Sequence, residues 1–476
     1  MQDKRTSGNR RKRYRKRKKK KSAGVMLCLL FCALVIGWVY YMTMQESMGR
    51  LNFPQDIAEG ETAKGENSVT VDTVDGSIQA TDAAEGTETI DNKPAESEIN
   101  QAESAESETK AESSQSESAA PTKSQDASEL AGKLLDDMTL EERICQMFVV
   151  TQDQLTGVSP VTRSGDTTKA AIEKYPVGGI VYFAANLVDR EQCISMISNI
   201  QDYSRLGLFI AVDEEGGIVS RLGKNPAMGI TAFSDMKVIG DTGDTSKAYH
   251  VGYTIGTEIA ELGFNLDFAP VADVYSNPDN TVIGTRAFSE DAQTAASMVA
   301  ACVQGFQDSG MLCSLKHFPG HGDTAADSHY GEAEIMKTLE ELYECELIPF
   351  QAGIEAGAPF VMIGHLTLPQ VIEEKVPASL SYDIVTGLLR EELGFDGVII
   401  TDSMSMQAIT DQYSSGEAAV KAIQAGVDIV LMPYSLEDAV SGVKAAVQSG
   451  QLTEERINES VLRILTLKIQ SGIITE

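Results

Sequence analysis

The sequence predicts an α/β protein whose main domain is a (β/α)8 TIM barrel, preceded by a transmembrane helix and a disordered linker. Eight short apolar runs alternate with segments of helical period over about 340 residues of the C-terminal part. Such alternation is typical of a parallel sheet with helical crossovers, and eight units fit a barrel. No G-x-G-x-x-G follows the first run, which argues against a dinucleotide-binding open sheet.

The apolar runs are five to seven residues long and are separated by the candidate helices. The predicted strands are residues 146–150, 179–183, 208–212, 264–270, 313–317, 360–365, 397–401 and 428–432. The predicted helices are residues 190–205, 246–262, 291–308, 339–356, 381–392, 416–424 and 454–470. Glycine marks several of the joints, as at Gly394 and Gly426.

Charge divides the 476 residues, which carry a formal net charge of -31, into three segments. Residues 1–50 hold 14 Lys and Arg against two acidic residues, whereas residues 51–130 hold four Lys against 19 acidic residues. The remaining residues are acidic and rich in apolar side chains. A general nucleic-acid binder would present a basic face, so we expect no nucleic-acid partner.

The first segment predicts a membrane anchor. Residues 1–21 form a basic tail, and residues 22–45 are uncharged and apolar over a length that can cross a bilayer as a helix. Positive charge on one flank predicts a cytoplasmic tail and an exported remainder. A cleaved signal peptide is the alternative, although no small-x-small cleavage site follows the apolar run. We therefore expect a single-pass protein of the cell membrane with its C-terminal domain outside the cytoplasm.

The second segment predicts a tether. Residues 46–128 are rich in Glu, Ser, Ala and Thr and contain one aromatic side chain, Phe53. Such a composition cannot bury enough apolar surface to offset its ordering entropy, so we expect a disordered acidic linker. Residues 129–476 then form the catalytic barrel.

Polar residues gather directly after the predicted strands, where a barrel has its active site. They are Asp213 and Arg221 after the third strand, Arg286 after the fourth, Lys316 and His317 on the fifth, and Asp402 after the seventh. Cations beside a carboxylate suit the hydroxyl groups of a sugar, although each arginine can also simply pair with a nearby acid. Burying an unpaired carboxylate is costly, so Asp402 is predicted to be a nucleophile or a metal ligand.

Three of the five histidines, His317, His321 and His329, lie within 13 residues. The first two have the spacing of a helical zinc pair, but a Pro-Gly pair between them prevents a regular helix, so we expect no metal here. We expect no organic cofactor either. His321 is interpreted as a loop residue that satisfies backbone groups. Asp327 stands two residues before His329 and can fix its tautomer and raise its basicity, which makes His329 a candidate proton donor and acceptor.

Several motifs together resemble those of the family 3 glycoside hydrolases, in the β-N-acetylglucosaminidase branch. The longest is K-H-F-P-G-H-G-x-x-x-x-D-S-H, from Lys316 to His329. The others are V-D-E-E-G-G-x-V-x-R at 212–221, F-A-P-V-x-D-V at 268–274, I-G-x-R-x-F at 283–288 and T-D-S-M-x-M at 401–406. Their order and spacing agree over roughly residues 130–470.

The resemblance implies a single-domain retaining hydrolase in which Asp402 is the nucleophile and His329 is the acid/base, oriented by Asp327. It further implies a set of residues that bind a terminal N-acetylglucosamine: Asp213, Arg221, Arg286, Lys316 and His317. One departure is Glu214, where the family commonly has glutamine.

Together these features predict a membrane-anchored, monomeric, exo-acting β-N-acetylhexosaminidase on the outside of a bacterial cell. It would remove terminal β-linked N-acetylglucosamine from glycans such as peptidoglycan fragments. The alternatives are a β-N-acetylglucosaminide phosphorylase, a β-glucosidase of the same family, and a non-catalytic glycan-binding surface protein.

Overall fold

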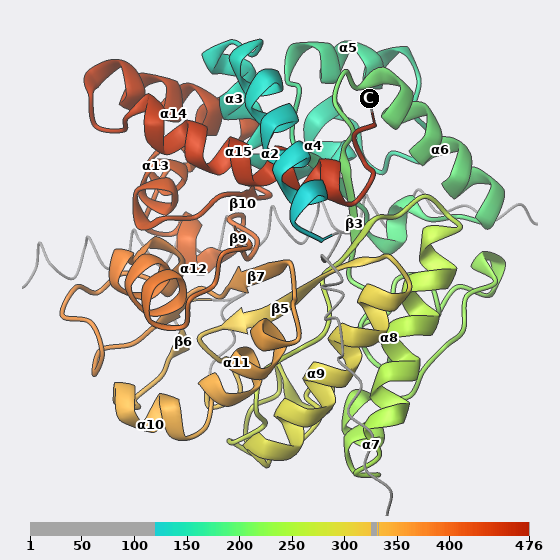
Figure 1. The fold of residues 1–476 in the computed structure, drawn as a ribbon, viewed down its shortest axis with the longest axis vertical. Coiled ribbons are helices and arrows are strands. Elements are labelled where there is room, and N and C mark those ends of the chain that lie inside the picture. The colour runs from blue at the N-terminus through green and yellow to red at the C-terminus, as the bar shows by residue number, and fades with distance from the viewer. Residues whose placement is uncertain (1–119, 325–330, 332, 476) are drawn as a thin grey trace, which may run out of the picture. The chain divides into compact units, whose positions relative to one another are not determined.

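The computed structural model describes residues 120–324, 331 and 333–475, and its core is a nearly closed barrel of eight parallel strands (Figure 1). The strands, in barrel order, are β10 (Val430–Leu431), β1 (Phe148–Thr151), β2 (Gly179–Val181), β3 (Phe209–Val212), β4 (Leu266–Asp267), β5 (Leu312–Phe318), β7 (Phe360–Ile363) and β9 (Val398–Thr401). A parallel bridge between Ile400 and Ile429 joins the two ends of the sheet.

The predicted barrel is confirmed, because each of the eight strands falls within or overlaps one predicted apolar run. Strands such as β1 (FVVT) and β9 (VIIT) are buried along their whole length. One face of each strand packs inside the barrel and the other packs against the helices, so the strands have no solvent-facing side that would require polar residues.

Helices surround the strands as crossovers, and many begin at a side chain that caps the first turn. Asp189, Asp291 and Ser414 each accept a hydrogen bond from a backbone N–H three residues later. The longer crossover helices are α5 (Asp166–Lys174), α6 (Arg190–Tyr203), α8 (Thr245–Ala260), α9 (Ala292–Asp308), α11 (Leu347–Glu355), α13 (Ser415–Ala425) and α14 (Leu436–Ser449). Shorter ones are α3 (Leu140–Gln146), α4 (Gln152–Thr156), α7 (Met236–Gly240), α10 (Leu339–Glu344) and α12 (Gln407–Thr410).

Several segments differ from the sequence prediction. The single helix predicted over residues 339–356 is broken between α10 and α11, where Cys345 leaves the helical region with φ -142° and ψ -77°. Residues 383–392 form the π-helix η5 (Asp383–Glu392) instead of an α-helix. A second, two-stranded sheet of β6 (Ala333–Glu334) and β8 (Leu366–Thr367) was not predicted.

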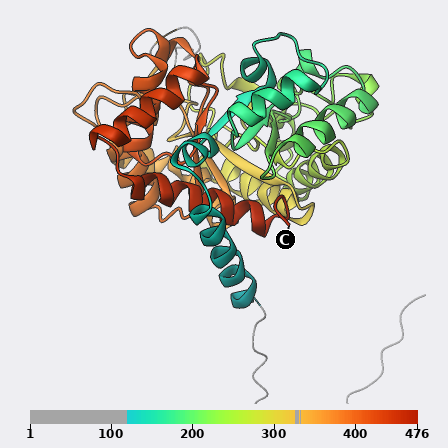
Figure 2. The ribbon, with the colours of Figure 1, turned by 90° about the horizontal axis from the view of Figure 1, so that it is seen from above.

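Two helices cover the N-terminal ends of the barrel strands. The C-terminal helix α15 (Glu454–Gln470) has the predicted bounds, and its Lys468 reaches Gln146 before β1 and the ring of Phe209 at the start of β3. Helix α2 (Ala120–Asp136) lies on the same side (Figure 2). Its first residues fall in the range 46–128 that was predicted to be a disordered linker, so this helix begins before residue 129, the predicted start of the barrel domain.

The predicted tail at residues 1–21, the anchor at 22–45 and nearly all of the linker lie outside the described residues. Within residues 120–324 and 333–475, no helix is both long and apolar enough to span a membrane.

Candidate active site

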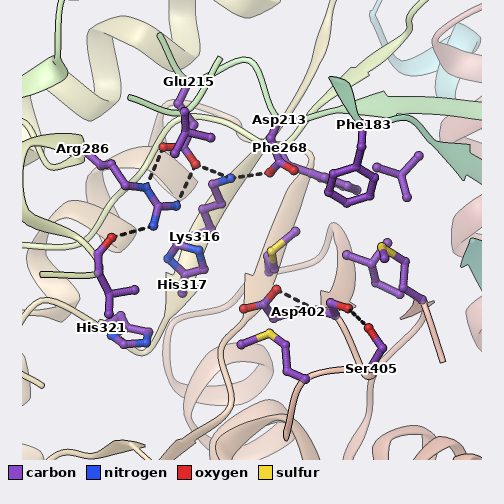
Figure 3. Close-up of a pocket in the computed structure, with 18 of the residues that line it drawn as sticks. Phe183, Asp213, Glu215, Phe268, Arg286, Lys316, His317, His321, Asp402 and Ser405 are labelled. Atoms are coloured by element: carbon purple, nitrogen blue, oxygen red, sulfur yellow. Dashed lines mark hydrogen bonds and ion pairs between the residues drawn. The ribbon is translucent and has the colours of Figure 1, made fainter. Parts of the chain in front are cut away.

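A cavity of about 480 Å³ opens at the C-terminal ends of the barrel strands (Figure 3). This volume lies within the roughly 300–1,000 Å³ range of small-molecule sites. Its polar lining residues are Asp213, Glu215, Arg221, Arg286, Lys316, His317, His321, Asp402, Ser403 and Ser405. Its apolar lining includes Phe183, Phe268, Met362, Met406 and Met432. A pocket with charged groups on part of its wall and apolar side chains on the rest suits a ligand with both hydroxyl groups and a C–H face.

Lys316 is the centre of a charged cluster, which we define as Asp213, Glu215, Arg221, Arg286 and Lys316. Its side chain is 2% exposed, and its ammonium lies 2.7 Å from Asp213 Oδ1 and 2.6 Å from Glu215 Oε1. Arg286 grips the same Glu215 with two hydrogen bonds of 2.8 Å, from Nε to Oε2 and from a terminal nitrogen to Oε1. These two hydrogen bonds together fix the orientation of both side chains.

For Glu215 and Lys316, the ion pairs of the cluster outweigh the cost of burial. Burial alone raises the pKa of Glu215, but the charges of Arg286 and Lys316 hold this pKa well below its ordinary value. Burial alone lowers the pKa of Lys316, but Asp213 and Glu215 raise this pKa above its ordinary value. Both groups therefore stay charged at neutral pH, and the cluster offers fixed cations and carboxylates to a bound ligand.

Arg221 stands at the edge of the cluster, and its position depends on Glu214. A terminal nitrogen of Arg221 lies 3.6 Å from Asp213 Oδ2, and its guanidinium carbon lies 5.5 Å from the centre of the Phe183 ring. The buried Glu214 carboxylate accepts the backbone N–H groups of Arg221 and Leu222, each at 2.7 Å, and the Ser220 hydroxyl at 2.5 Å. Both carboxylate oxygens thus receive donors, a task that glutamine at this position cannot perform with its single oxygen.

Asp273 organises the two histidines of the fifth-strand motif. Its Oδ2 lies 2.8 Å from His317 Nδ1, and its Oδ1 accepts the backbone N–H of His321 at 2.7 Å. Because the carboxylate accepts a hydrogen bond from Nδ1 of His317, Nε2 is the ring nitrogen left to meet a ligand. Burial lowers the pKa of His321, and the nearby His317 lowers it further, while Asp273 and Asp402 act in the opposite direction.

Asp402 directly follows β9 and lies on the cavity wall across from the charged cluster (Figure 3). Its backbone N–H donates to the Ile363 carbonyl at the end of β7 at 2.8 Å. Its Oδ1 accepts the backbone N–H of Ser403 at 2.6 Å. The Asp402 carboxyl group is half-buried, and these two contacts hold it on the wall of the pocket.

The structure brings six of the eight site residues predicted from the sequence into one cavity. These six are Asp213, Arg221, Arg286, Lys316, His317 and Asp402. The other two, Asp327 and His329, lie outside the described residues.

Sequence reasoning missed Glu215 as the shared partner of Lys316 and Arg286, although it stands inside the D-E-E-G-G motif. It also assigned His321 only to a loop, whereas this side chain lines the cavity. Asp402 was predicted to be either a nucleophile or a metal ligand. No group of three or more His, Cys, Asp or Glu side chains that could hold a metal occurs among the residues that the structure describes.

A comparison with known families matches residues 139–467 to the glycosyl hydrolase family 3 N terminal domain. The chain belongs to glycosyl hydrolase family 3. Within this family, it is 37% identical over 326 residues to Beta-hexosaminidase A of Pseudoalteromonas piscicida, covering 62% of this chain and 54% of that protein. It is 34% identical over 325 residues to Beta-hexosaminidase LpqI of Mycobacterium tuberculosis, covering 64% of this chain and 79% of that protein.

Among solved structures, this family 3 chain is similar to a glycoside hydrolase family 3 β-N-acetylglucosaminidase from Paenibacillus sp. str. FPU-7. The sequence identity is 37% and the TM-score is 0.67, with 71% of this chain and 64% of that chain covered. The chain thus spans about half the length of the Pseudoalteromonas relative and just under two thirds of the Paenibacillus structure.

Proposed function

We propose that this family 3 protein is an exo-acting, retaining β-N-acetylhexosaminidase. Its substrates would be glycans with a terminal β-linked N-acetylglucosamine, such as peptidoglycan fragments. The observation that carries the proposal is the cavity in which Asp402 faces the charged cluster across a space of about 480 Å³. The names of the Pseudoalteromonas, Mycobacterium and Paenibacillus relatives support the choice of sugar.

In this proposal the charged cluster and His317 hold the terminal sugar. Asp213 accepts hydrogen bonds from two sugar hydroxyls, while Lys316 and Arg221, both within 4 Å of it, donate to the hydroxyl oxygens. Because Glu215 already fixes Arg286 and Lys316, these cations do not have to reorganise when the sugar binds. Preorganised donors of this kind stabilise the transition state at little entropic cost.

The reaction proceeds in two displacements. In the first, the Asp402 carboxylate attacks the anomeric carbon, the glycosidic C–O bond breaks, and the departing oxygen takes a proton from the imidazolium of His329. In the second, neutral His329 takes a proton from water, the water oxygen attacks the anomeric carbon, and the bond to Asp402 breaks. Two inversions give net retention. Asp327, two residues before His329, would keep that imidazole in the reactive tautomer.

The substrate is tested by comparing 4-nitrophenyl β-N-acetylglucosaminide with 4-nitrophenyl β-glucoside, each with and without phosphate. We expect a kcat/KM for the N-acetylglucosaminide that is at least about 100-fold higher, since rejecting an analogue that leaves polar site groups unpaired is worth this much or more. Free N-acetylglucosamine should be the product whether or not phosphate is present. Preference for the glucoside, or release of a sugar 1-phosphate, would contradict the proposed hydrolase.

We also propose that residues 22–45 anchor the enzyme in the cell membrane, with residues 1–21 in the cytoplasm. Residues 46–128 would act as an acidic tether, and the catalytic domain would be a monomer outside the cytoplasm. The support is the one-sided cluster of basic residues beside an uncharged apolar stretch. We expect the full chain to stay with membranes in high salt and to be released by detergent, whereas a chain without residues 1–45 should be found in the soluble fraction. Release of the full chain by salt alone would argue against an anchor.

A further inference from the structure

A buried histidine that no motif predicted links the Asp402 turn to the neighbouring part of the barrel. His365 lies between β7 and β8 and is 1% exposed. Its Nε2 is 2.9 Å from the carbonyl oxygen of Ser403, and its Nδ1 is 2.8 Å from the hydroxyl of Ser379 in the 3-10 helix η4 (Ala378–Leu380). A carbonyl oxygen can only accept a hydrogen bond, so Nε2 carries a proton and is the donor. In the neutral ring, Nδ1 then accepts a hydrogen bond from the Ser379 hydroxyl.

Ser403 connects this histidine to the carboxylate. The backbone N–H of Ser403 donates to Asp402 Oδ1 at 2.6 Å, and its carbonyl oxygen accepts from His365 and from the backbone N–H of Met406 at 3.1 Å. The peptide group on each side of Ser403 is therefore fixed. Any rotation about this residue would move the N–H that holds the Asp402 carboxylate.

We propose that His365 is a positioning residue for the hydrolysis described above. By holding the Ser403 carbonyl, it keeps the Ser403 amide in place, and this amide aims the Asp402 carboxylate at the anomeric carbon. The inference rests on the proposed role of Asp402. His365 does not line the cavity, and its hydrogen bonds to Ser403 and Ser379 point to an effect on the rate through the orientation of Asp402.

Glutamine and asparagine separate this role from simple packing. The amide nitrogen of a glutamine at position 365 reaches the place of Nε2 and can still donate to Ser403. The shorter asparagine reaches only the place of Nδ1, so it keeps the Ser379 contact and loses the one to Ser403. The glutamine thus keeps the hydrogen bond to Ser403 and loses the one to Ser379, whereas the asparagine does the reverse, and both replace the ring with a smaller polar side chain.

The test measures kcat, KM and inhibition by N-acetylglucosamine for His365→Asn and His365→Gln, with the thermal unfolding midpoint of each variant. We expect His365→Asn to lower kcat about 10- to 100-fold, since small misplacements of a reacting group have effects of this size. KM and the inhibition constant should stay within about threefold of the parent, because the charged cluster still binds the sugar. His365→Gln should recover most of the kcat although its midpoint matches that of His365→Asn.

The control is His250→Asn, which changes an exposed histidine of α8 and should leave all four quantities unchanged. Equal kcat values for the glutamine and asparagine variants would overturn the inference, whether both resemble the parent or both fall with the unfolding midpoint. Should neither variant fold, Ser379→Ala carries the test: the ring loses the partner of Nδ1, as it does in the glutamine variant, so kcat should fall only about two- to threefold at constant KM, and a parental kcat would overturn the inference.

The two proposals fail in different ways. A parent enzyme that hydrolyses no N-acetylglucosaminide, or an Asp402→Asn variant as active as the parent, overturns the proposed function and this inference with it. An active parent and an inactive Asp402→Asn variant, together with indistinguishable glutamine and asparagine variants at position 365, overturn the positioning role alone.

Discussion

Replacing Asp402 with alanine should lower kcat for 4-nitrophenyl β-N-acetylglucosaminide by about 10⁴-fold or more, since losing the proposed covalent nucleophile removes the whole two-step route. The structure gives the physical reason. The carboxylate at the end of β9 is held by the Ser403 amide at 2.6 Å, in the cavity that the charged cluster lines. KM should change little, because the contacts of the cluster with the sugar remain.

Azide distinguishes a lost nucleophile from a damaged pocket. In Asp402→Ala the methyl group leaves room on the side from which the carboxylate attacks, so azide should enter there and displace nitrophenolate in one step. The product would be the α-glycosyl azide, with inverted configuration, because only one displacement occurs. Nitrophenolate leaves without a proton, so this rescue does not depend on the acid/base group.

Asp411→Ala is the matched control for this experiment. Asp411 follows α12, nine residues after Asp402, is exposed and does not line the cavity. Its removal should leave kcat and KM near the parental values. An Asp402→Ala variant whose kcat stays within about tenfold of the parent would exclude a covalent role for this carboxylate, as would azide rescue that gives the β-azide.

Much of the site could be found in the sequence because the active site of a barrel lies where its strands end. Asp213, Lys316 and Asp402 each stand at the end of an apolar run, and closing the barrel brings the ends of all eight strands to one pole. Their meeting therefore follows from topology alone. The sequence analysis also missed helix α14, although helical periodicity could have revealed it. Its buried residues have helical spacing: Leu436, Ala439, Val440, Val443 and Ala446.

The contacts that could not be predicted are those between side chains distant in sequence. Glu215 meets Arg286 across 71 residues, and His365 meets Ser403 across 38. The sequence around an arginine does not indicate which acidic side chain of this chain will form an ion pair with it. The break of the predicted helix at Cys345 has the same origin, because the local sequence has helical period while tertiary packing decides the backbone.

A buried lysine, Lys468, lies at the N-terminal ends of the barrel strands, away from the cavity. We expect its charge to lower the free energy of unfolding. Lys468 of α15 is 0% exposed, and its ammonium contacts Gln146 Oε1 at 3.0 Å and lies 4.9 Å from the centre of the Phe209 ring. Burial lowers the pKa of Lys468 from 10.5 to about 7. Among the residues that the structure describes, no carboxylate forms an ion pair with this ammonium that would offset the cost of its desolvation.

Replacing Lys468 with methionine should raise the free energy of unfolding at about pH 6 by roughly 2–4 kcal/mol. A pKa lowered by about 3.5 units corresponds to roughly 5 kcal/mol. Leaving the Gln146 oxygen without its donor costs about 1–3 kcal/mol of this gain. Methionine has nearly the length of the lysine stem, so the space should stay filled.

The pH dependence identifies the cause. Between about pH 7 and pH 10.5 the unfolded chain binds the Lys468 proton and the folded chain does not, so the parent gains stability as the pH rises through this window. Below about pH 7 both states are protonated and the full cost is present. The advantage of Lys468→Met should therefore be largest near pH 6 and shrink steadily toward pH 10, as measured by urea unfolding. Lys247→Met, at an exposed position of α8, should show no such trend. An advantage that is independent of pH would mean that methionine improves packing and that the buried ammonium is not the source of the cost.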